Sequence, residues 1–305
     1  MNKVFGRLSL HPKERKSVIF DGEMVEASTL EKADFMQVFR KKLKPTQEQE
    51  DLISEWYDFN KSAIENCKNK DGGTGLFRET GEPYFNHVAS VAMNAMQLLP
   101  NCDVDMVLAL LAHDTPEDTG GFCLPRDQWD ISEDGLLGRN YVDFDALAAR
   151  VGERAARMIV AVQKPQLMKP KSKCTEDELE IYRLAKCNDI IRDSDVAVQA
   201  VIMKMFDRAH NLITICSKDL DDLTDEGRVK AQKKIRETRD KLMPVLQAVV
   251  NDNPLDEVLG GLHLVFKQWF SEWLTTDQVK AIYSDGETER QRMLVDMREE
   301  LLEAA

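Results

Sequence analysis

Residues 108–119 read Leu108-Ala-Leu-Leu-Ala-His113-Asp114-Thr-Pro-Glu117-Asp118-Thr119, an apolar run that ends in four ionisable side chains. The apolar run is typical of a buried helix. Glu117 lies four residues after His113, and Asp118 lies four residues after Asp114. One helical turn would therefore stack two acids beside an imidazole–carboxylate pair, a layout that suits a metal ion with an activated water. Alternatively, the histidine is a core residue and the acids cap a second helix that begins at the intervening proline.

The composition of the chain favours helix. It has 305 residues, of which 43% are hydrophobic, and it contains only 15 glycines and 10 prolines. This length is enough for one large or two modest domains with a substantial core. Sparse glycine and proline, together with recurring Glu, Lys, Leu and Ala, are typical of a mostly helical protein. The predicted fold class is therefore all-α.

The net charge limits the partners that can be expected, and the cysteines bear on the cellular location. A formal net charge of −13 argues against binding to a DNA or RNA polymer, because that affinity comes from neutralising many phosphates. A small anionic ligand is still compatible with it. The six cysteines are scattered without a CxxC pair, and no secretory signal is recognised, so a cytoplasmic location is expected. No apolar run approaches the ~20 residues of a membrane span, so no membrane partner is expected.

Hydrophobic spacing divides the chain into helices and loops. An Asp-Gly turn at residues 21–22, between short apolar stretches, predicts a β-hairpin near the N-terminus. Two surface loops are predicted at 119–143 and 165–173, and the first is long enough for a lid or a binding loop. The C-terminal helices show no catalytic signal, and their aromatic residues predict packing on the body or on a second copy. Helices are predicted over 46–70, 87–99, 103–113, 144–162, 175–193, 195–218, 225–251, 254–273 and 276–302.

Polar side chains outside the central stretch could complete a site. His87 stands in the first turn of its predicted helix, where a lone histidine is usually structural. On the helix over 195–218, polar residues recur at helical spacing, which indicates either a helix that lines a site or a solvated face. These residues are Lys204, Asp207, Asn211 and Thr214. With His113 and Asp114, the side chains of His87 and Asp207 would make a set of two imidazoles and two carboxylates. Such a set suits a divalent ion such as manganese, iron or zinc.

Three motifs in a fixed order give the chain a family resemblance. They are Arg78-x-x-Gly-Glu-Pro-Tyr-x-x-His87, Leu110-Leu-Ala-His113-Asp114-x-x-Glu117-Asp118-Thr119 and Lys204-Met-Phe-Asp207-Arg208-Ala-His210-Asn211. Through them the chain resembles the HD superfamily of metal-dependent phosphohydrolases, and within it the hydrolase domain of the RelA/SpoT alarmone enzymes and their small stand-alone relatives. Val88 stands where a proline commonly follows the first histidine, and the loop after Thr119 is longer than expected.

The resemblance covers about residues 46–217 and leaves both ends of the chain unexplained. It implies an HD-domain helical bundle over residues 46–217. Residues 1–45 would then form a small N-terminal appendage that includes the predicted hairpin. Residues 218–305 would form a helical C-terminal extension, whose aromatic residues could pack on the body or join two copies in a homo-oligomer.

The resemblance also implies roles for individual residues. One divalent metal ion, with Mn²⁺ favoured over Fe²⁺ or Zn²⁺, would be held by His87, His113, Asp114 and Asp207. Glu117 and Asp118 would position and deprotonate the attacking water. Arg78 would contact the nucleotide base, Asn211 and Thr214 the nucleoside, and Lys164 and Lys204 the phosphates. His210 would be structural. A dinuclear centre would need additional histidines, and the sequence has none between His113 and His210.

The implied activity is removal of the 3′-diphosphate from guanosine alarmones by a metal-activated water. The partner would thus be a small phosphorylated nucleotide. Two alternatives stay open at this point. The same chemistry could act on another phosphorylated nucleotide, or the chain could be a nucleotide-binding or partner-binding module without turnover. The intact Glu117 and Asp118 argue against the inactive module, since they have little use if no water is activated.

Overall fold

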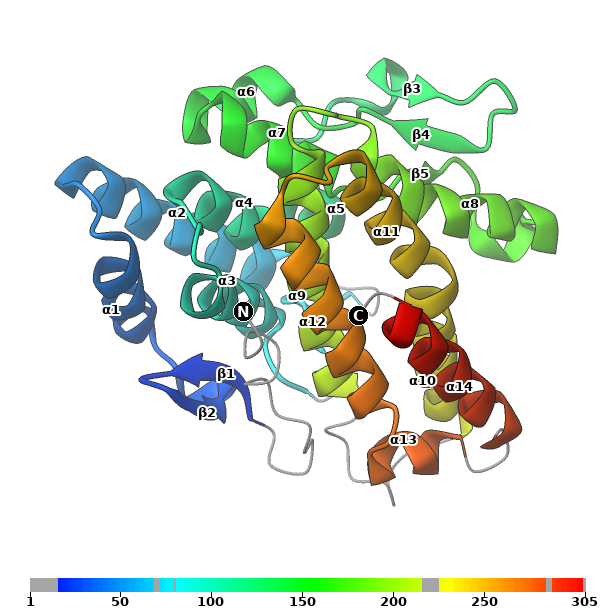
Figure 1. Cartoon of the computed structure of the whole chain (residues 1–305). Coiled ribbons are helices and arrows are strands. Elements are labelled where there is room, and N and C mark those ends of the chain that lie inside the picture. The colour runs from blue at the N-terminus through cyan, green and yellow to red at the C-terminus, as the bar shows by residue number, and fades with distance from the viewer. Residues whose placement is uncertain (1–15, 69–71, 79–80, 216–224, 284–286, 304–305) are drawn as a thin grey trace.

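A computed structural model describes residues 16–68, 72–78, 81–215, 225–283 and 287–303 of the chain. Helices dominate the molecule, as the composition predicts, and the strands within the described ranges form two small sheets. Figure 1 shows the helices that follow the N-terminal hairpin on one side of the molecule and the C-terminal helices on the other, with α9 between them. The all-α expectation is therefore confirmed.

The predicted hairpin is present at the start of the described chain. Strands β1 (Lys16–Phe20) and β2 (Glu23–Glu26) pair in antiparallel fashion. The turn between them has positive φ angles at Asp21 (47°) and Gly22 (89°), as an Asp-Gly turn requires. Helix α1 (Lys32–Leu43) follows, and the sequence prediction omitted it. Its buried apolar face packs against α2 and α3, so this segment is tied closely to the body.

The central bundle positions the candidate site. Helix α2 begins after Thr46, whose hydroxyl accepts a hydrogen bond from the backbone N–H of Gln49, so the predicted capping box is confirmed. Helix α4 begins after Asp103 and is buried along nearly its whole length. Helices α3, α4 and α9 pack on one another. The helices of this group are α2 (Gln47–Asn66), α3 (Tyr84–Leu98), α4 (Val104–Ala112), α5 (Thr115–Thr119) and α9 (Ala197–Ile215).

The prediction of a single helix over 144–162 is wrong in one respect. The structure has two helices, α6 (Phe144–Val151) and α7 (Glu153–Ala161), which are separated at Gly152. The φ angle of this glycine is +87°, a value that side chains with a Cβ rarely adopt. The local apolar pattern runs through the break, and for that reason periodicity alone did not find it.

Parts of the two loops predicted at 119–143 and 165–173 form a small sheet. Strand β4 (Leu137–Arg139) pairs with β3 (Asp130–Ile131) on one side and with β5 (Gln166–Leu167) on the other. The strands are two or three residues long, too short for an alternating pattern to be recognised. Helix α8 (Glu176–Asn188) then begins after Thr175 with the predicted capping box.

The C-terminal extension packs on the bundle. Helices α11 and α12 both contact α9, and the aromatic side chains of α12 are buried within this chain. A π-helical turn, Thr238–Leu242, interrupts the helix predicted over 225–251 just before Pro244. The helices are α10 (Asp225–Glu237), α11 (Met243–Asp252), α12 (Glu257–Trp273), α13 (Asp277–Ile282) and α14 (Glu287–Glu303).

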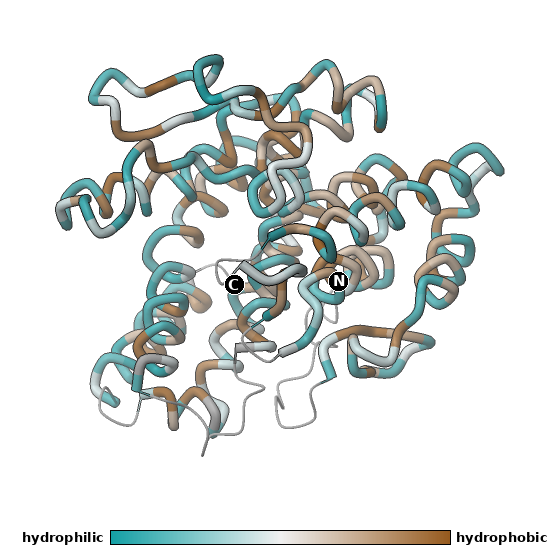
Figure 2. The backbone as a smooth tube through the Cα atoms, turned by 180° about the vertical axis from the view of Figure 1, so that it is seen from behind, coloured by the Kyte–Doolittle hydropathy of each residue, from teal (hydrophilic) through white to brown (hydrophobic). Residues whose placement is uncertain are grey.

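One hydrophobic core joins the hairpin, the central bundle and the C-terminal extension, and a separate small cluster of Leu136, Leu137 and Ala185 lies between β4 and α8. The main core includes Val18 of the hairpin, Leu111 of the central bundle and Phe266 of the extension. Viewed from behind in Figure 2, hydrophobic and hydrophilic residues alternate along the outer helices, as expected for helices with one buried face. The predicted boundaries at 45 and 217 remain predictions. Among the described residues, no helix is both long and apolar enough to cross a membrane.

Candidate metal centre

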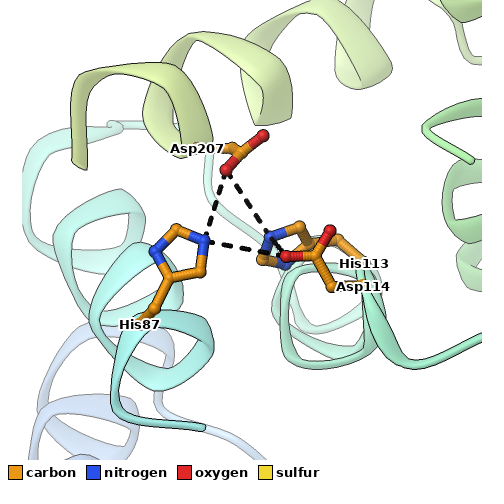
Figure 3. Close-up of side chains that lie close together, drawn as sticks. All are labelled: His87, His113, Asp114 and Asp207. Carbon is orange, nitrogen blue, oxygen red and sulfur yellow. Dashed lines mark ion pairs between the residues drawn. The ribbon is translucent and has the colours of Figure 1, made fainter. Parts of the chain in front are cut away.

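Four side chains from three parts of the bundle meet at one point (Figure 3). His87 is on the first turn of α3, His113 and Asp114 lie at the junction of α4 and α5, and Asp207 is near the middle of α9. Asp207 Oδ1 lies 3.3 Å from Nε2 of His87 and 3.8 Å from Nε2 of His113. Asp114 Oδ2 lies 3.1 Å from the His113 nitrogen and 3.7 Å from the His87 nitrogen.

The donor set fits one divalent cation. The Nε2 atoms of His87 and His113 are buried and have no hydrogen-bond partner among the described residues. Buried polar atoms are rarely left so, and a ligand would satisfy them. Metal–ligand bonds of about 2.1 Å place neighbouring ligand atoms about 3 to 3.5 Å apart, close to the separations found here. Nitrogen and oxygen donors together suit manganese, iron or zinc.

Hydrogen bonds behind the four residues fix their orientation. Nδ1 of His87 lies 2.8 Å from Nδ1 of His210, and Nδ1 of His113 lies 2.7 Å from the carbonyl oxygen of Leu110. Both imidazoles therefore direct Nε2 toward the carboxylates. The hydroxyl of Tyr84 donates to Asp114 at 2.8 Å. Outer contacts of this kind hold metal ligands in place in other proteins, and this contact puts His210 where it could orient His87.

Burial and neighbouring charges shift the pKa values of residues in this centre. Burial and the nearby Arg78 lower the pKa of His87 to about 4, so its imidazole is neutral at pH 7. Burial alone would raise the pKa of Asp207, but Lys204 and His87 hold it well below its usual range. Asp114 raises the pKa of His113 against the effect of burial. A cation bound there would therefore compete with the proton that Asp114 favours on His113.

The two expected catalytic acids follow the centre on α5. Glu117 accepts a hydrogen bond from Nζ of Lys164 at 2.8 Å, so the proposed phosphate contact Lys164 is also an ion-pair partner of the acid. Burial, with Asp114 and Glu117 close by, raises the pKa of Asp118 to about 7. The carboxyl of Asp118 therefore lies in a setting where it can exist in both protonation states near neutrality.

The expected nucleoside contacts form a second cluster beside the centre. Nη2 of Arg78 donates to Asn211 Oδ1 at 3.1 Å and to Thr214 Oγ1 at 2.7 Å. The side-chain amide of Asn211 donates in turn to Asp207 Oδ1 at 2.5 Å. The Arg78 guanidinium also lies 6.0 Å from the ring centroid of Tyr84. These contacts join residues more than 130 positions apart and link the arginine to a metal-ligand candidate.

A cavity of about 320 Å³ opens onto the metal centre. Of the expected site residues, its lining includes Asp114, Asp207, Glu117, Lys164, Lys204 and Asn211. Lys204 is buried, and its Nζ lies 3.5 Å from Asp207 Oδ2. The lining also includes residues that sequence reasoning missed, namely Tyr84, Lys186, Arg208, Lys230, Lys233 and Lys234.

Sequence signals for some of these missed residues do exist. Tyr84 and Arg208 stand inside the motifs that carry the family resemblance. Lys230, Lys233 and Lys234 follow one another at three and four residues, the spacing of one helix face. The spacing alone cannot distinguish a face that lines a cavity from a solvated one.

Curated proteins provide an independent comparison. A guanosine-3′,5′-bis(diphosphate) 3′-pyrophosphohydrolase of Aquifex aeolicus is 28% identical over 153 residues, and one of Haemophilus influenzae is 29% identical over 151 residues. The chloroplastic protein RSH1 of Arabidopsis thaliana, named as a GTP diphosphokinase, is 24% identical over 143 residues. Over about half of its length the chain is thus similar to RelA/SpoT-type proteins, as the three sequence motifs predict. Family models of known domains give no match to it.

The match to these RelA/SpoT-type HD proteins is partial. It covers 50% of this chain and 17% of the Aquifex protein, and 48% and 18% for the Haemophilus protein. The chain thus spans less than a fifth of the length of the curated relatives it matches. The helical fold and the buried His/Asp group that could hold a divalent ion agree with this similarity.

Proposed function

We propose that this chain hydrolyses guanosine alarmones, removing the 3′-diphosphate from guanosine-3′,5′-bis(diphosphate) and its triphosphate form. Convergence of two histidines and two aspartates on one buried point, with unpartnered Nε2 atoms, carries the proposal. Similarity to two proteins named as 3′-pyrophosphohydrolases supports the choice of substrate.

The four converging residues would hold the metal ion, which we propose to be Mn²⁺. His87 and His113 offer imidazole nitrogen donors, and Asp114 and Asp207 offer carboxylate oxygens. A bound divalent ion would supply Lewis-acid chemistry, by lowering the pKa of a water and screening phosphoryl charge. His210, Tyr84 and Asn211 keep the donor atoms aimed at the centre through their hydrogen bonds.

Glu117 and Asp118 would take the proton of the attacking water and orient it. Both follow the metal-ligand candidate Asp114 on the short helix α5. Glu117 also lines the cavity, so its carboxylate is accessible to a bound substrate. The Lys164 ammonium at 2.8 Å holds the Glu117 carboxylate in position and adds positive charge beside the phosphate that is cleaved.

Arg78, Asn211 and Thr214 would bind the nucleoside end. The planar guanidinium of Arg78 can stack on a purine, and its bonds to Asn211 and Thr214 hold it in place. Lys204, buried beside Asp207, would contact a phosphate oxygen together with Lys164.

A nucleotide panel tests this proposal. The purified chain would be incubated with Mn²⁺ and guanosine-3′,5′-bis(diphosphate), its adenosine counterpart, guanosine 5′-diphosphate or a deoxynucleoside triphosphate. We expect pyrophosphate release from guanosine-3′,5′-bis(diphosphate). We expect none from the two compounds that are phosphorylated only at the 5′ position. The Asp207→Ala variant, purified in the same way, controls for contaminating phosphatases.

Other outcomes would replace the proposal with one of its alternatives. Turnover of a different nucleotide would keep the chemistry and change the substrate. Tight nucleotide binding with no product from any member of the panel would identify a binding module.

A further inference from the structure

A second cavity, of about 310 Å³, borders the turn that follows α7. Its walls are the end of β4 with the segment that leads into α6, one face of α7, and the turn at 189–193 after α8. Figure 1 shows β4, α6 and α7 together at the top of the view. Within the described ranges, Lys164 is the one residue that this lining shares with the cavity at the metal centre. The second cavity is therefore a separate place for a ligand.

The apolar part of the lining gives the second cavity room for a ring. It consists of Tyr141, Val142, Phe144, Val160, Ala161 and Pro165. Phe144 and Val160 are half-buried, and the other four are buried. Cavities of about 300 to 1,000 Å³ with mostly apolar walls and a few polar groups are typical of small-molecule sites. A volume of about 310 Å³ suits a compact ring compound rather than a large cofactor.

Three arginines line the second cavity, and one of them has no acidic partner. Nε of Arg139 lies 2.6 Å from Asp189, and Nη1 of Arg157 lies 3.6 Å from Asp193, so both acids of the lining are engaged. Arg192 is exposed and forms no ion pair with any residue that the structure describes. A guanidinium of this kind can bind a carboxylate or a phosphate through two parallel hydrogen bonds. The charge of Arg192 is thus available to an anionic ligand.

Hydrogen bonds hold the polar wall of the second cavity in place. The hydroxyl of Tyr141 donates to the carbonyl oxygen of Lys164 at 3.1 Å. Nε2 of Gln163 donates to the carbonyl oxygen of His113 at 2.8 Å, and Nζ of Lys164 pairs with Glu117. The wall is therefore formed before any ligand arrives, and a preformed site loses little free energy to ordering on binding.

We propose that the second cavity is a binding site for a small organic anion, whose planar ring lies against the apolar wall and whose anionic group pairs with Arg192. The ligand would bind in addition to the substrate of the metal centre and not in its place, because the two linings have only Lys164 in common among the described residues. The site does not depend on the proposed hydrolase function.

Three probes with the same ring test the chemical class of the ligand. Indole-3-acetate carries an anion, indole-3-acetamide is neutral and tryptamine is a cation. Ligand-observed NMR titrations of the full chain, without added metal, would give the three affinities. We expect indole-3-acetate to bind at least about threefold more tightly than the amide, and tryptamine to bind most weakly. Equal affinity for the acetate and the amide would overturn the anionic class, and no binding of any probe would overturn the site.

Arg192→Gln tests the residue that would hold the anionic group. Arg298→Gln is the matched control, because Arg298 of α14 is also exposed and has no ion pair within the described ranges. We expect Arg192→Gln to bind the acetate and the amide equally, with the affinity for the amide unchanged. Arg298→Gln should keep the preference for the acetate. A preference that survives Arg192→Gln would overturn the proposed contact.

Val160→Phe tests where the ring lies, because it adds the volume of a ring to the apolar wall. Val295→Phe, at an exposed position of α14, is the control for the added side chain. We expect Val160→Phe to weaken the binding of indole-3-acetate and of the amide at least about tenfold, and Val295→Phe to leave both unchanged. Far-UV circular dichroism would verify the fold. Wild-type affinity in folded Val160→Phe would place the probes elsewhere and overturn the site.

A variant at the metal centre separates the two cavities. Asp207 lines the first cavity and not the second, so Asp207→Ala should keep wild-type affinity for indole-3-acetate. A loss of affinity of tenfold or more in this variant would place the probe at the metal centre and overturn the proposal. None of these measurements uses a nucleotide or turnover, so failure of the proposed hydrolase function would leave their outcome unaffected.

Discussion

Asp207 connects the two histidines of the candidate centre, because its Oδ1 lies within 4 Å of both Nε2 atoms. We predict that Asp207→Ala lowers the metal content from about one ion per chain to a small fraction of that value. Elemental analysis of dialysed protein would measure it. Asp195→Ala, which removes an exposed carboxylate just before α9, is the matched control and should keep the ion. Equal metal content in the two variants would remove Asp207 from the site.

Glu117 offers a test of proton transfer that is separate from metal binding. Its carboxylate lines the cavity and pairs with Lys164, and Glu117 is not one of the four candidate metal ligands. We predict that Glu117→Gln keeps the metal and the fold but lowers kcat by about 10²- to 10⁴-fold, since an amide cannot accept the proton of water. Steady-state kinetics would measure the loss. An unchanged kcat would mean that Glu117 has no part in proton transfer and serves only as an acid in the first turn of a helix.

Arg78 should affect specificity rather than the metal. Its hydrogen bonds to Asn211 and Thr214 hold a planar guanidinium that lysine cannot reproduce. We predict that Arg78→Lys weakens discrimination between guanine and other bases while the metal content stays near one ion per chain. Relative kcat/KM across the nucleotide panel would show it. Loss of the metal, or an unchanged base preference, would contradict the base-contact role.

At the scale of the elements, Gly152 separates α6 from α7 and allows the second helix to turn toward the site. Gln163, just beyond α7, donates to the carbonyl oxygen of His113 at 2.8 Å, so the placement of α7 supports the metal centre. No atom lies within 4 Å of a Cβ added at Gly152, and its φ of +87° leaves backbone strain as the main cost of a side chain.

We therefore predict that Gly152→Ala lowers the free energy of unfolding by about 1 to 3 kcal/mol. Urea denaturation would measure the difference. Gly260→Ala is the matched control, because Gly260 lies inside α12 with the same open surroundings and without a positive φ. It should be neutral or stabilising by up to about 1 kcal/mol. Similar losses in both variants would show that φ at residue 152 is not the cause.

At the scale of the whole molecule, the C-terminal helices complete the core that holds α9. Leu246 of α11 and Phe266 and Trp269 of α12 are fully or almost fully buried in the common hydrophobic cluster. Exposing a side chain of this size costs several kcal/mol, and the net stability of a typical protein is only about 5 to 15 kcal/mol.

We predict that a chain shortened to residues 1–217 loses cooperative unfolding and metal binding together. Near-UV circular dichroism and urea titration, with the full chain as reference, would measure this. A shortened chain that unfolds cooperatively at the urea concentration of the full chain would instead support an independent domain with the boundary predicted from the sequence.

Most of the helices and the four residues of the candidate centre could be predicted from the sequence. Capping boxes at Thr46 and Thr175 and the Asp-Gly turn are local signals, because the hydrogen bonds that define them span only a few residues. The motifs around His87, His113 and Asp207 were sufficient to predict that these residues meet. The roles proposed for them await the experiments above.

The contacts between distant segments that complete the site could not be predicted and become visible only in the folded chain. The bond between His87 and His210, the sheet that β5 forms with β4 and the approach of the α10 lysines to the cavity all join residues far apart in the chain. Local periodicity shows which face of a helix is apolar, but it cannot show which other segment that helix meets. Lys233 therefore looks like a solvated residue in the sequence, and it is the packing of α10 beside α9 that brings its charge to the cavity.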